Sequence, residues 1–327
     1  MKDLLLCIIL SLVITILLGR LVIPILKRIK AGQPILKYVS THKDKNGTPT
    51  MGGLFFILPS IVVFYIFNGF ENLACNVSVA ITLAFMLVGF MDDFIKIKVK
   101  DNQGLKAYQK IIFQLGIALI AGFFAYRNGL TNFYLPFSKN AINLGFWTIP
   151  LVAIVFIAIT NSVNLTDGLD SLASSVSIVY LAFLSLIIFL QSKINGFNYF
   201  LTSENQGLIL LSLSFIGGIL GFLVYNSNKA SVFMGDTGSL ALGGLIGSVS
   251  VFSCNTLLIP LLGITFVASS LSVIIQVIVY KAKKKRVFLM APLHHHFQLK
   301  GYSESKISYI YSLITGIIGT FLIISYL

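Results

Sequence analysis

Long apolar runs recur along the whole of this sequence, and they constrain the fold more than any other feature. Each run has about 17 to 25 residues, the length that an α-helix needs to cross the hydrocarbon core of a bilayer. The 327 residues are 56% hydrophobic and only 11% charged, whereas soluble domains are about one quarter charged. The sequence therefore predicts an all-α polytopic membrane protein, in which residues 1–327 form a single integral membrane domain.

Ten of these runs are predicted to cross the membrane as helices. The first run resembles a signal peptide, but it is long and has no evident cleavage site, so we expect it to be retained. The predicted spans lie near residues 4–26, 51–67, 74–91, 108–126, 147–163, 172–190, 207–225, 237–253, 257–280 and 307–326.

Basic residues are distributed unevenly between the segments that connect these spans. Most of the 24 Lys and Arg residues fall in alternate connecting segments. The positive-inside rule places these segments in the cytoplasm, so both termini are expected on the extracytoplasmic side. The net charge of +13 is then a property of one membrane face. It suits a bilayer with anionic lipid, and it gives no reason to expect a nucleic acid partner. The basic segments are 27–50, 92–107, 164–171, 226–236 and 281–306.

Acidic residues gather on the same predicted face, which the positive-inside rule does not explain. Three separate chain segments bring carboxylates to the point where a span meets this surface. A divalent cation needs such hard oxygen ligands, with coordination left open for substrate phosphates. The pattern thus favours a metal-dependent enzyme. The five acids are Asp92, Asp93, Asp167, Asp170 and Asp236.

Helix capping is the alternative explanation for each acidic segment. Asp92 and Asp93 could end a helix and pair with the lysines that follow them, while Asp167 or Asp236 could cap the next helix. Capping explains two adjacent acids less well, because neighbouring helix residues point about 100° apart. One of the pair can then face a lysine while the other faces the bundle.

Two further segments could bind phosphate. Thr48 before Pro49 is typical of a helix start and would open the second span, with its free N–H groups favouring an anion. The run His294, His295 and His296 follows a basic stretch, and neutral histidine is a good partner for phosphate or hydroxyl groups. Simple solvation on a loop is the alternative for these histidines.

Five motifs together resemble a known family. The stretches GTPTMGG, MDDFIK, NLTDGLD, FMGDTGS and APLHHHFQLKG occur in the order found in the bacterial phospho-N-acetylmuramoyl-pentapeptide transferases. The resemblance extends from about residue 43 to 306. This family is a branch of the polyprenyl-phosphate hexose-1-phosphate transferases. The resemblance implies ten transmembrane helices, termini outside, Mg²⁺ dependence, and a multi-pass protein of the bacterial plasma membrane whose active site faces the cytoplasm.

The resemblance also implies a reaction. The family transfers phospho-MurNAc-pentapeptide from UDP-MurNAc-pentapeptide to undecaprenyl phosphate, which gives UMP and lipid I for peptidoglycan synthesis. A sister transferase that uses a UDP-N-acetylhexosamine is one alternative. A cation-coupled transporter is another, although its acids would be expected nearer the membrane midplane. Whether the chain forms a homodimer stays open.

By motif, the resemblance implies roles for individual residues. Asp236 resembles the Mg²⁺ ligand, Asp92 and Asp93 the essential pair near the reacting phosphates, and His294 the catalytic-site histidine. The implied substrate contacts are Lys45, Thr50, Lys96, Lys110, Asn164, Asp167, Asp170, Asn226, Phe233, Gln276 and His295, with Asn164, Asp167 and Asp170 on the nucleotide side and Phe233 against the uracil.

The chemistry of two reacting anions explains why such residues would gather. Mg²⁺ and lysines can offset phosphate charge. The acceptor phosphate is largely ionised at neutral pH, since its second pKa is near 6. We expect Asp92 to take the residual proton and hold the acceptor, and Asp93 to organise the polar entrance with Lys96. Direct attack is preferred, and a covalent aspartyl-phosphate route is left open.

Overall fold

Helices dominate the structure, and the all-α prediction is confirmed. The computed structural model describes residues 2–29, 47–99, 104–138, 140–192 and 199–326. Two short strands, β1 and β2, pair in antiparallel register. The elements are α1 (Lys2–Arg28), α2 (Leu54–Asn68), α3 (Leu73–Val99), α4 (Ala107–Arg127), β1 (Asn132–Tyr134), β2 (Ala141–Asn143), η2 (Gly145–Trp147), α5 (Thr148–Thr166), α6 (Leu172–Gln191), α7 (Tyr199–Asn226), α8 (Gly235–Phe252), η3 (Thr256–Leu258), α9 (Ile259–Leu262), α10 (Ile264–Lys283), α11 (Leu293–Leu299) and α12 (Glu304–Ile324).

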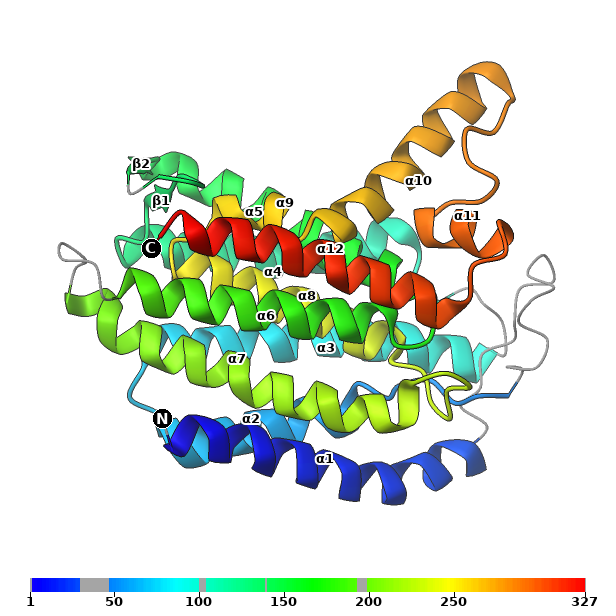
Figure 1. Ribbon diagram of the computed structural model, residues 1–327, viewed down its shortest axis with the longest axis horizontal. Helices are drawn as coiled ribbons and strands as arrows, with labels where there is room; N and C mark the ends of the chain where they lie inside the picture. Colours follow the sequence, from blue (N-terminus) through cyan, green and yellow to red (C-terminus); the bar gives the residue numbers. More distant parts are fainter. Residues whose placement is uncertain (1, 30–46, 100–103, 139, 193–198, 327) are drawn as a thin grey trace.

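The long helices run lengthwise beside one another as a bundle (Figure 1). Both ends of the chain lie at the end of the bundle that carries β1 and β2, and α11 lies at the other end. Helix α10 leans away from the bundle. The common location of the two chain ends agrees with an even number of crossings.

A helix occupies each of the ten predicted span positions. Among the described residues, eight helices are long and apolar enough to cross a membrane by length and composition. Helix α2 is apolar but shorter, with 15 residues, and α8 is not one of the eight. The polytopic prediction is confirmed, while the number of crossings and the side on which the termini lie stay predictions.

Helix α8 forms the centre of the bundle and carries the site. All of its residues from Thr237 to Phe252 are buried. Its glycines allow close approach: a Cβ at Gly243 would overlap the backbone of Thr160 in α5, and one at Gly244 would press on Phe85 in α3. Small residues let helix backbones pack closely in membrane proteins, so α8 is held firmly between α3 and α5.

Several helix boundaries differ from those predicted, and α7 begins at Tyr199 instead of near residue 207. Helix α3 does not end at its acids but continues to Val99, because the polar residues after Asp93 remain compatible with a helix on the surface of the bundle. The predicted span 257–280 is divided into η3, α9 and α10, with Gly263 between the last two helices. The apolar residues on both sides of Gly263 concealed this break from a hydropathy reading.

Candidate active site

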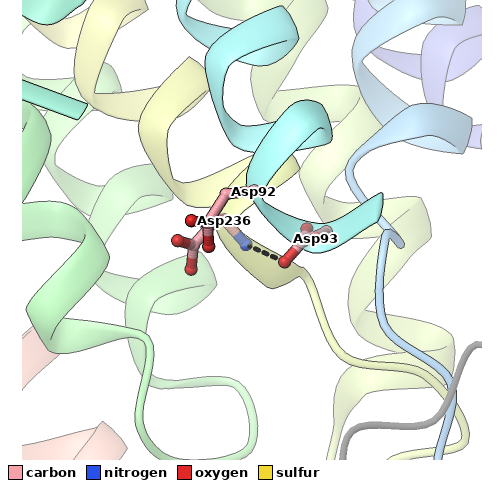
Figure 2. Close-up of side chains that lie close together, drawn as sticks. All are labelled: Asp92, Asp93 and Asp236. Atoms are coloured by element: carbon pink, nitrogen blue, oxygen red, sulfur yellow. Dashed lines mark hydrogen bonds between the residues drawn. The ribbon is translucent and has the colours of Figure 1, made fainter. Parts of the chain in front are cut away.

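Three carboxylates from two helices come together at the end of the bundle near α11. Asp92 and Asp93 lie towards the end of α3, and Asp236 lies in the first turn of α8. One oxygen from each lies within 4.8 Å of the others. Figure 2 shows Asp92 beside Asp236, with Asp93 pointing away on the other side of its helix. Adjacent helix residues diverge in this way, and the predicted difference between the two acids is confirmed.

Two lysines contact this carboxylate cluster. The Lys96 ammonium lies 2.6 Å from Asp92 Oδ2 and 3.5 Å from Asp236 Oδ2. Lys110 Nζ lies 2.6 Å from Asp236 Oδ2 and 3.0 Å from Asp92 Oδ2. Lys96 is 3.9 Å from Asp93 Oδ1, so its close partner is Asp92. Lys96 thus contacts both acids and lies closer to Asp92, which is four positions earlier on the same helix face. The expected role of Asp93 with Lys96 at the polar entrance stays a prediction.

The remaining contacts of Asp92 enclose its carboxylate. The backbone N–H of Leu105 donates to Asp92 Oδ1 at 2.7 Å. A Cβ at Gly104 would overlap the same carboxylate, so glycine is needed for this close approach. The Asp92 side chain is fully buried. Residues 104–105 thus pack directly against this carboxylate.

Asp236 is the most accessible of the three acids, with 16% of its side chain exposed. Asn164, at the end of α5, donates to Asp236 Oδ1 at 3.0 Å and to Ser239 Oγ at 2.8 Å. The structure therefore brings the predicted NLTDGLD segment to the carboxylate cluster through Asn164, while its role towards the nucleotide stays a prediction.

Asp170 and Asn226 hold the loop that leads to Asp236. Asp170 is buried, and its Oδ2 accepts a hydrogen bond from Ala230 N at 3.1 Å. The Asn226 amide donates to Val232 O at 3.0 Å, and its oxygen accepts from Ser171 N at 3.1 Å. These bonds place the two residues as supports of the site.

Asp167 is half-buried where α5 ends. It does not cap the next helix, because α6 begins at Leu172 with Ser171 at the N-cap position. Burial and the neighbouring carboxylates Asp236, Asp93 and Asp170 raise the pKa of Asp167. Its side chain therefore lies in the negative field of the cluster.

The three histidines have different environments. His294 is fully buried, and neither ring nitrogen has a hydrogen-bond partner among the described residues. A Cβ at Gly168 would overlap His294 Nε2, so the imidazole lies directly against the turn after Asp167. Burial, followed by the nearby His295, lowers the pKa of His294 well below its usual value. The ring is neutral near pH 7 and available to a ligand.

The other two histidines are already engaged. His295 Nδ1 lies 3.1 Å from Gln298 Oε1, and its ring centroid is 4.4 Å from that of His294. His296 Nδ1 accepts a hydrogen bond from Leu289 N at 3.1 Å. His295 Nε2 also lies close to the turn at Gly168, whereas His296 contacts the loop before α11.

The GTPTMGG segment does not open a helix. Gly52 N donates to Phe233 O at 2.9 Å and Phe233 N donates to Pro49 O at 2.8 Å. Residues 49–53 thus pair with the segment directly before α8, and α2 begins only at Leu54. The predicted helix start at Thr48 and Pro49 is wrong, because the backbone groups there are used in this long-range pairing.

The other predicted contacts are distributed around this core. Thr50 is buried, and a Cβ at Gly235 would contact both its hydroxyl and Asp93. Phe233 is half-buried. The Gln276 amide oxygen accepts from the N–H groups of Val287 and Phe288, so the amide holds the loop before α11. Lys45 lies outside the described residues.

Two site residues were missed from the sequence. Thr237 donates through its backbone and its hydroxyl to Asp93 Oδ2, at 2.9 and 2.7 Å, and Ser239 receives the second bond of Asn164. Both belong to the FMGDTGS motif. The sequence signal that could have identified them is the presence of two hydroxyl side chains in the helix turn directly after Asp236.

The donor set fits a magnesium ion. Mg²⁺ prefers carboxylate oxygens, uses one or two of them, and keeps other positions for water and phosphate. Asp236 offers such an oxygen with partial exposure, and Asp92 lies beside it. Among the described residues, three carboxylates face two ammonium groups there. The arrangement can therefore bind a cation together with a phosphate-bearing ligand.

Comparisons with known proteins show which family this chain resembles. The model of glycosyl transferase family 4 matches residues 75–254, and a phospho-N-acetylmuramoyl-pentapeptide-transferase signature matches residues 45–57. Relatives named phospho-N-acetylmuramoyl-pentapeptide-transferase are similar over most of the chain. The one from Clostridium novyi is 40% identical, covering 94% of this chain and 91% of the relative. The one from Helicobacter pylori is 42% identical, covering 85% and 80% respectively.

Proposed function

The chain belongs to the phospho-N-acetylmuramoyl-pentapeptide-transferase family, and we propose that it transfers phospho-MurNAc-pentapeptide from its UDP carrier to undecaprenyl phosphate. An oxygen of the lipid phosphate bonds to the β-phosphorus of the donor. The bond between that phosphorus and the bridging oxygen breaks, and UMP leaves with the electron pair. The products are UMP and lipid I, the lipid-linked precursor of peptidoglycan.

One observation supports this function beyond family membership: two lysines and three carboxylates meet where α3 approaches α8. Both substrates carry phosphate, so their encounter is between anions. The ammonium groups of Lys96 and Lys110 can attract them. Both ammonium groups also contact Asp92 and Asp236, so the carboxylates orient the lysines before a substrate arrives.

Asp236, with Asp92 beside it, would hold Mg²⁺, which when bound offsets charge on the pyrophosphate and makes UMP a better leaving group. Asn164 fixes the direction of the Asp236 carboxylate through its 3.0 Å hydrogen bond. Lys96 and Lys110 can move from carboxylate to phosphate oxygens without leaving the site.

The buried His294 is proposed to contact the donor. Its neutral ring can donate through one nitrogen and accept through the other, which suits a phosphate oxygen or a sugar hydroxyl. Gly168 permits its close approach to the turn that bears Asp167. Asp170 and Asn226 then support this side of the site through the loop 227–232.

A donor assay tests the substrate. We expect the purified full-length protein, in detergent with undecaprenyl phosphate and Mg²⁺, to release UMP from UDP-MurNAc-pentapeptide at least about 100-fold faster than from UDP-N-acetylglucosamine. A factor of 100 corresponds to about 2.7 kcal/mol, a difference that contacts to the lactyl-peptide portion can provide. Coupled detection of UMP measures both rates. Preference for the plain UDP-N-acetylhexosamine would identify the sister activity instead.

Labelling of single cysteines tests the proposed orientation in the bacterial plasma membrane. Lys284 and Asn140 are exposed and lie near opposite ends of the bundle, since Lys284 follows α10 and Asn140 lies between β1 and β2. After replacement of the three buried native cysteines, Lys284→Cys should react only with reagents that reach the cytoplasm. Asn140→Cys should react from outside intact cells. The reverse pattern would move the active site to the outer face.

A further inference from the structure

Asp93 and Thr237 form a contact between α3 and α8 that the transfer chemistry does not by itself require. Asp93 is fully buried. Its Oδ2 accepts from Thr237 N at 2.9 Å and from Thr237 Oγ1 at 2.7 Å, while its Oδ1 accepts from Asp236 N at 3.3 Å. The carboxylate is therefore engaged by donors of the first turn of α8 on both of its oxygens.

These donors are the groups that a helix leaves unpaired at its start. The first N–H groups of an α-helix have no partner within the helix, and a negative charge there is favoured by the helix dipole. Residue Met234 at the N-cap position of α8 provides no side-chain cap. Asp93 supplies that cap from α3, so a side chain of one helix caps the start of the other.

A second contact keeps the two backbones in register. A Cβ at Gly89 would overlap the Asp236 carbonyl, so α3 touches α8 directly at this point. Gly89 and Asp93 are four residues apart and share one face of α3. Between them they fix both the N–H and the C=O of Asp236. Gly235, with φ of 73°, then turns the chain into the helix.

We propose that Thr237 is a positioning residue that, through Asp93, sets where the Asp236 carboxylate lies. This inference rests on the proposed function, in which Asp236 holds a divalent cation. Thr237 donates its hydroxyl proton to Asp93, so this hydroxyl is not available as a donor to a substrate. Its hydroxyl acts by keeping the Asp93 oxygens aligned with the first turn of α8.

Binding of Mn²⁺ to the full-length protein in detergent, followed by electron paramagnetic resonance without substrate, tests this role. Thr237→Val keeps the shape and removes the hydroxyl, and we expect it to weaken Mn²⁺ binding about tenfold or more. Outer contacts of a metal site are typically worth about 10–100-fold in affinity. Thr237→Ser restores the donor and should bind within about threefold of the wild type.

Thr82→Val is the matched control. Thr82 is fully buried in α3, and its hydroxyl donates to Ser78 O in its own helix at 2.8 Å. The same change of side chain there should leave Mn²⁺ affinity within about twofold. Thr237→Ala removes the hydroxyl and adds no new group in its place. It replaces Thr237→Val as the test variant if Thr237→Val does not give a folded, monodisperse protein.

A double-mutant cycle separates positioning from general destabilisation. If Thr237 acts through Asp93, Thr237→Val should add less than about twofold to the loss of Mn²⁺ affinity in an Asp93→Ala background, which has no side-chain acceptor for the Thr237 hydroxyl. Independent effects would multiply instead. Multiplying losses, or full Mn²⁺ binding by both Thr237→Val and Thr237→Ala, would overturn the inference while the metal site stands. A wild type that binds no Mn²⁺ would overturn the proposed metal site and the inference with it.

Discussion

Asp236→Asn should lower the rate of transfer by about 10³-fold or more at saturating Mg²⁺ while the protein remains folded. An amide is a far weaker metal ligand than a carboxylate, and a bound metal contributes several kcal/mol to stabilising charge in the transition state. Each 1.4 kcal/mol corresponds to about a factor of ten in rate. Asp236 also holds Lys110 at 2.6 Å, so the substitution releases a lysine as well. UMP release measures the effect.

Asp3→Asn is the matched control for this variant. Asp3 is likewise an acid in the first turn of a helix, α1. It is exposed, and α1 begins at the end of the bundle opposite α11. The Asp3→Asn variant should catalyse transfer at the wild-type rate. Size-exclusion profiles and melting temperatures of both variants establish that they are folded. Near-normal turnover by a folded Asp236→Asn protein would remove Asp236 from the metal site.

The location of the site could be predicted from sequence because apolar runs and acids each report on depth in the membrane. Asp92, Asp93 and Asp236 stand where apolar runs end, and their segments were predicted to share one face. Helices of sufficient length then bring such residues to one level, whatever their neighbours in the bundle. The structure confirms this meeting of α3 and α8.

The use of each side chain could not be predicted, because it depends on contacts between distant segments. Asp93 caps α8 only because Gly89 lets the two backbones touch. Local signals at Thr48 and Pro49 favoured a helix start, yet pairing with the strand-like segment before α8 overrides them. In both places a long-range backbone contact decides the outcome, and no local sequence pattern encodes it.

Asp92→Asn should lower transfer by about 10²- to 10⁴-fold near pH 6.5, the range typical for loss of a general base. The acceptor phosphate has a second pKa near 6, so at pH 6.5 part of it carries a proton that Asp92 can take. At pH 8.5 almost none does. The loss should therefore shrink as the pH rises. Rates of UMP release from pH 6 to pH 9 measure this change.

The loss should not vanish at high pH, because Asp92 has a second task. Its Oδ2 lies 2.6 Å from Lys96 and 3.0 Å from Lys110, and an uncharged amide cannot orient two ammonium groups equally well. This part of the effect is independent of the protonation of the acceptor. A loss that stays constant from pH 6 to pH 9 would contradict a role for Asp92 as base and leave only the placement of the lysines.

Asp93→Asn should impair transfer for a different reason, and it serves as the comparison for Asp92→Asn. Its amide oxygen can replace Oδ2 and still accept from Thr237 N and Thr237 Oγ1. Its NH2 group then faces the Asp236 N–H that donates to Oδ1 in the wild type, so Asp236 loses part of what fixes its position. We expect a higher apparent requirement for Mg²⁺ and a pH profile parallel to that of the wild type. A loss that shrinks at high pH in both variants would show that the two acids share one role.

Incubation without lipid acceptor distinguishes direct attack from a covalent route, and it uses the same two acids. With direct attack, rigorously lipid-free wild type should release no UMP from labelled UDP-MurNAc-pentapeptide, since the nucleophile is absent. The contacts of Asp92 and Asp93 favour this result, because each carboxylate is engaged by donors on both oxygens. A nucleophilic aspartate would have to break those contacts to reach the β-phosphorus. Release of one UMP per protein, with the label retained on Asp92 or Asp93, would overturn direct attack and make that aspartate the nucleophile.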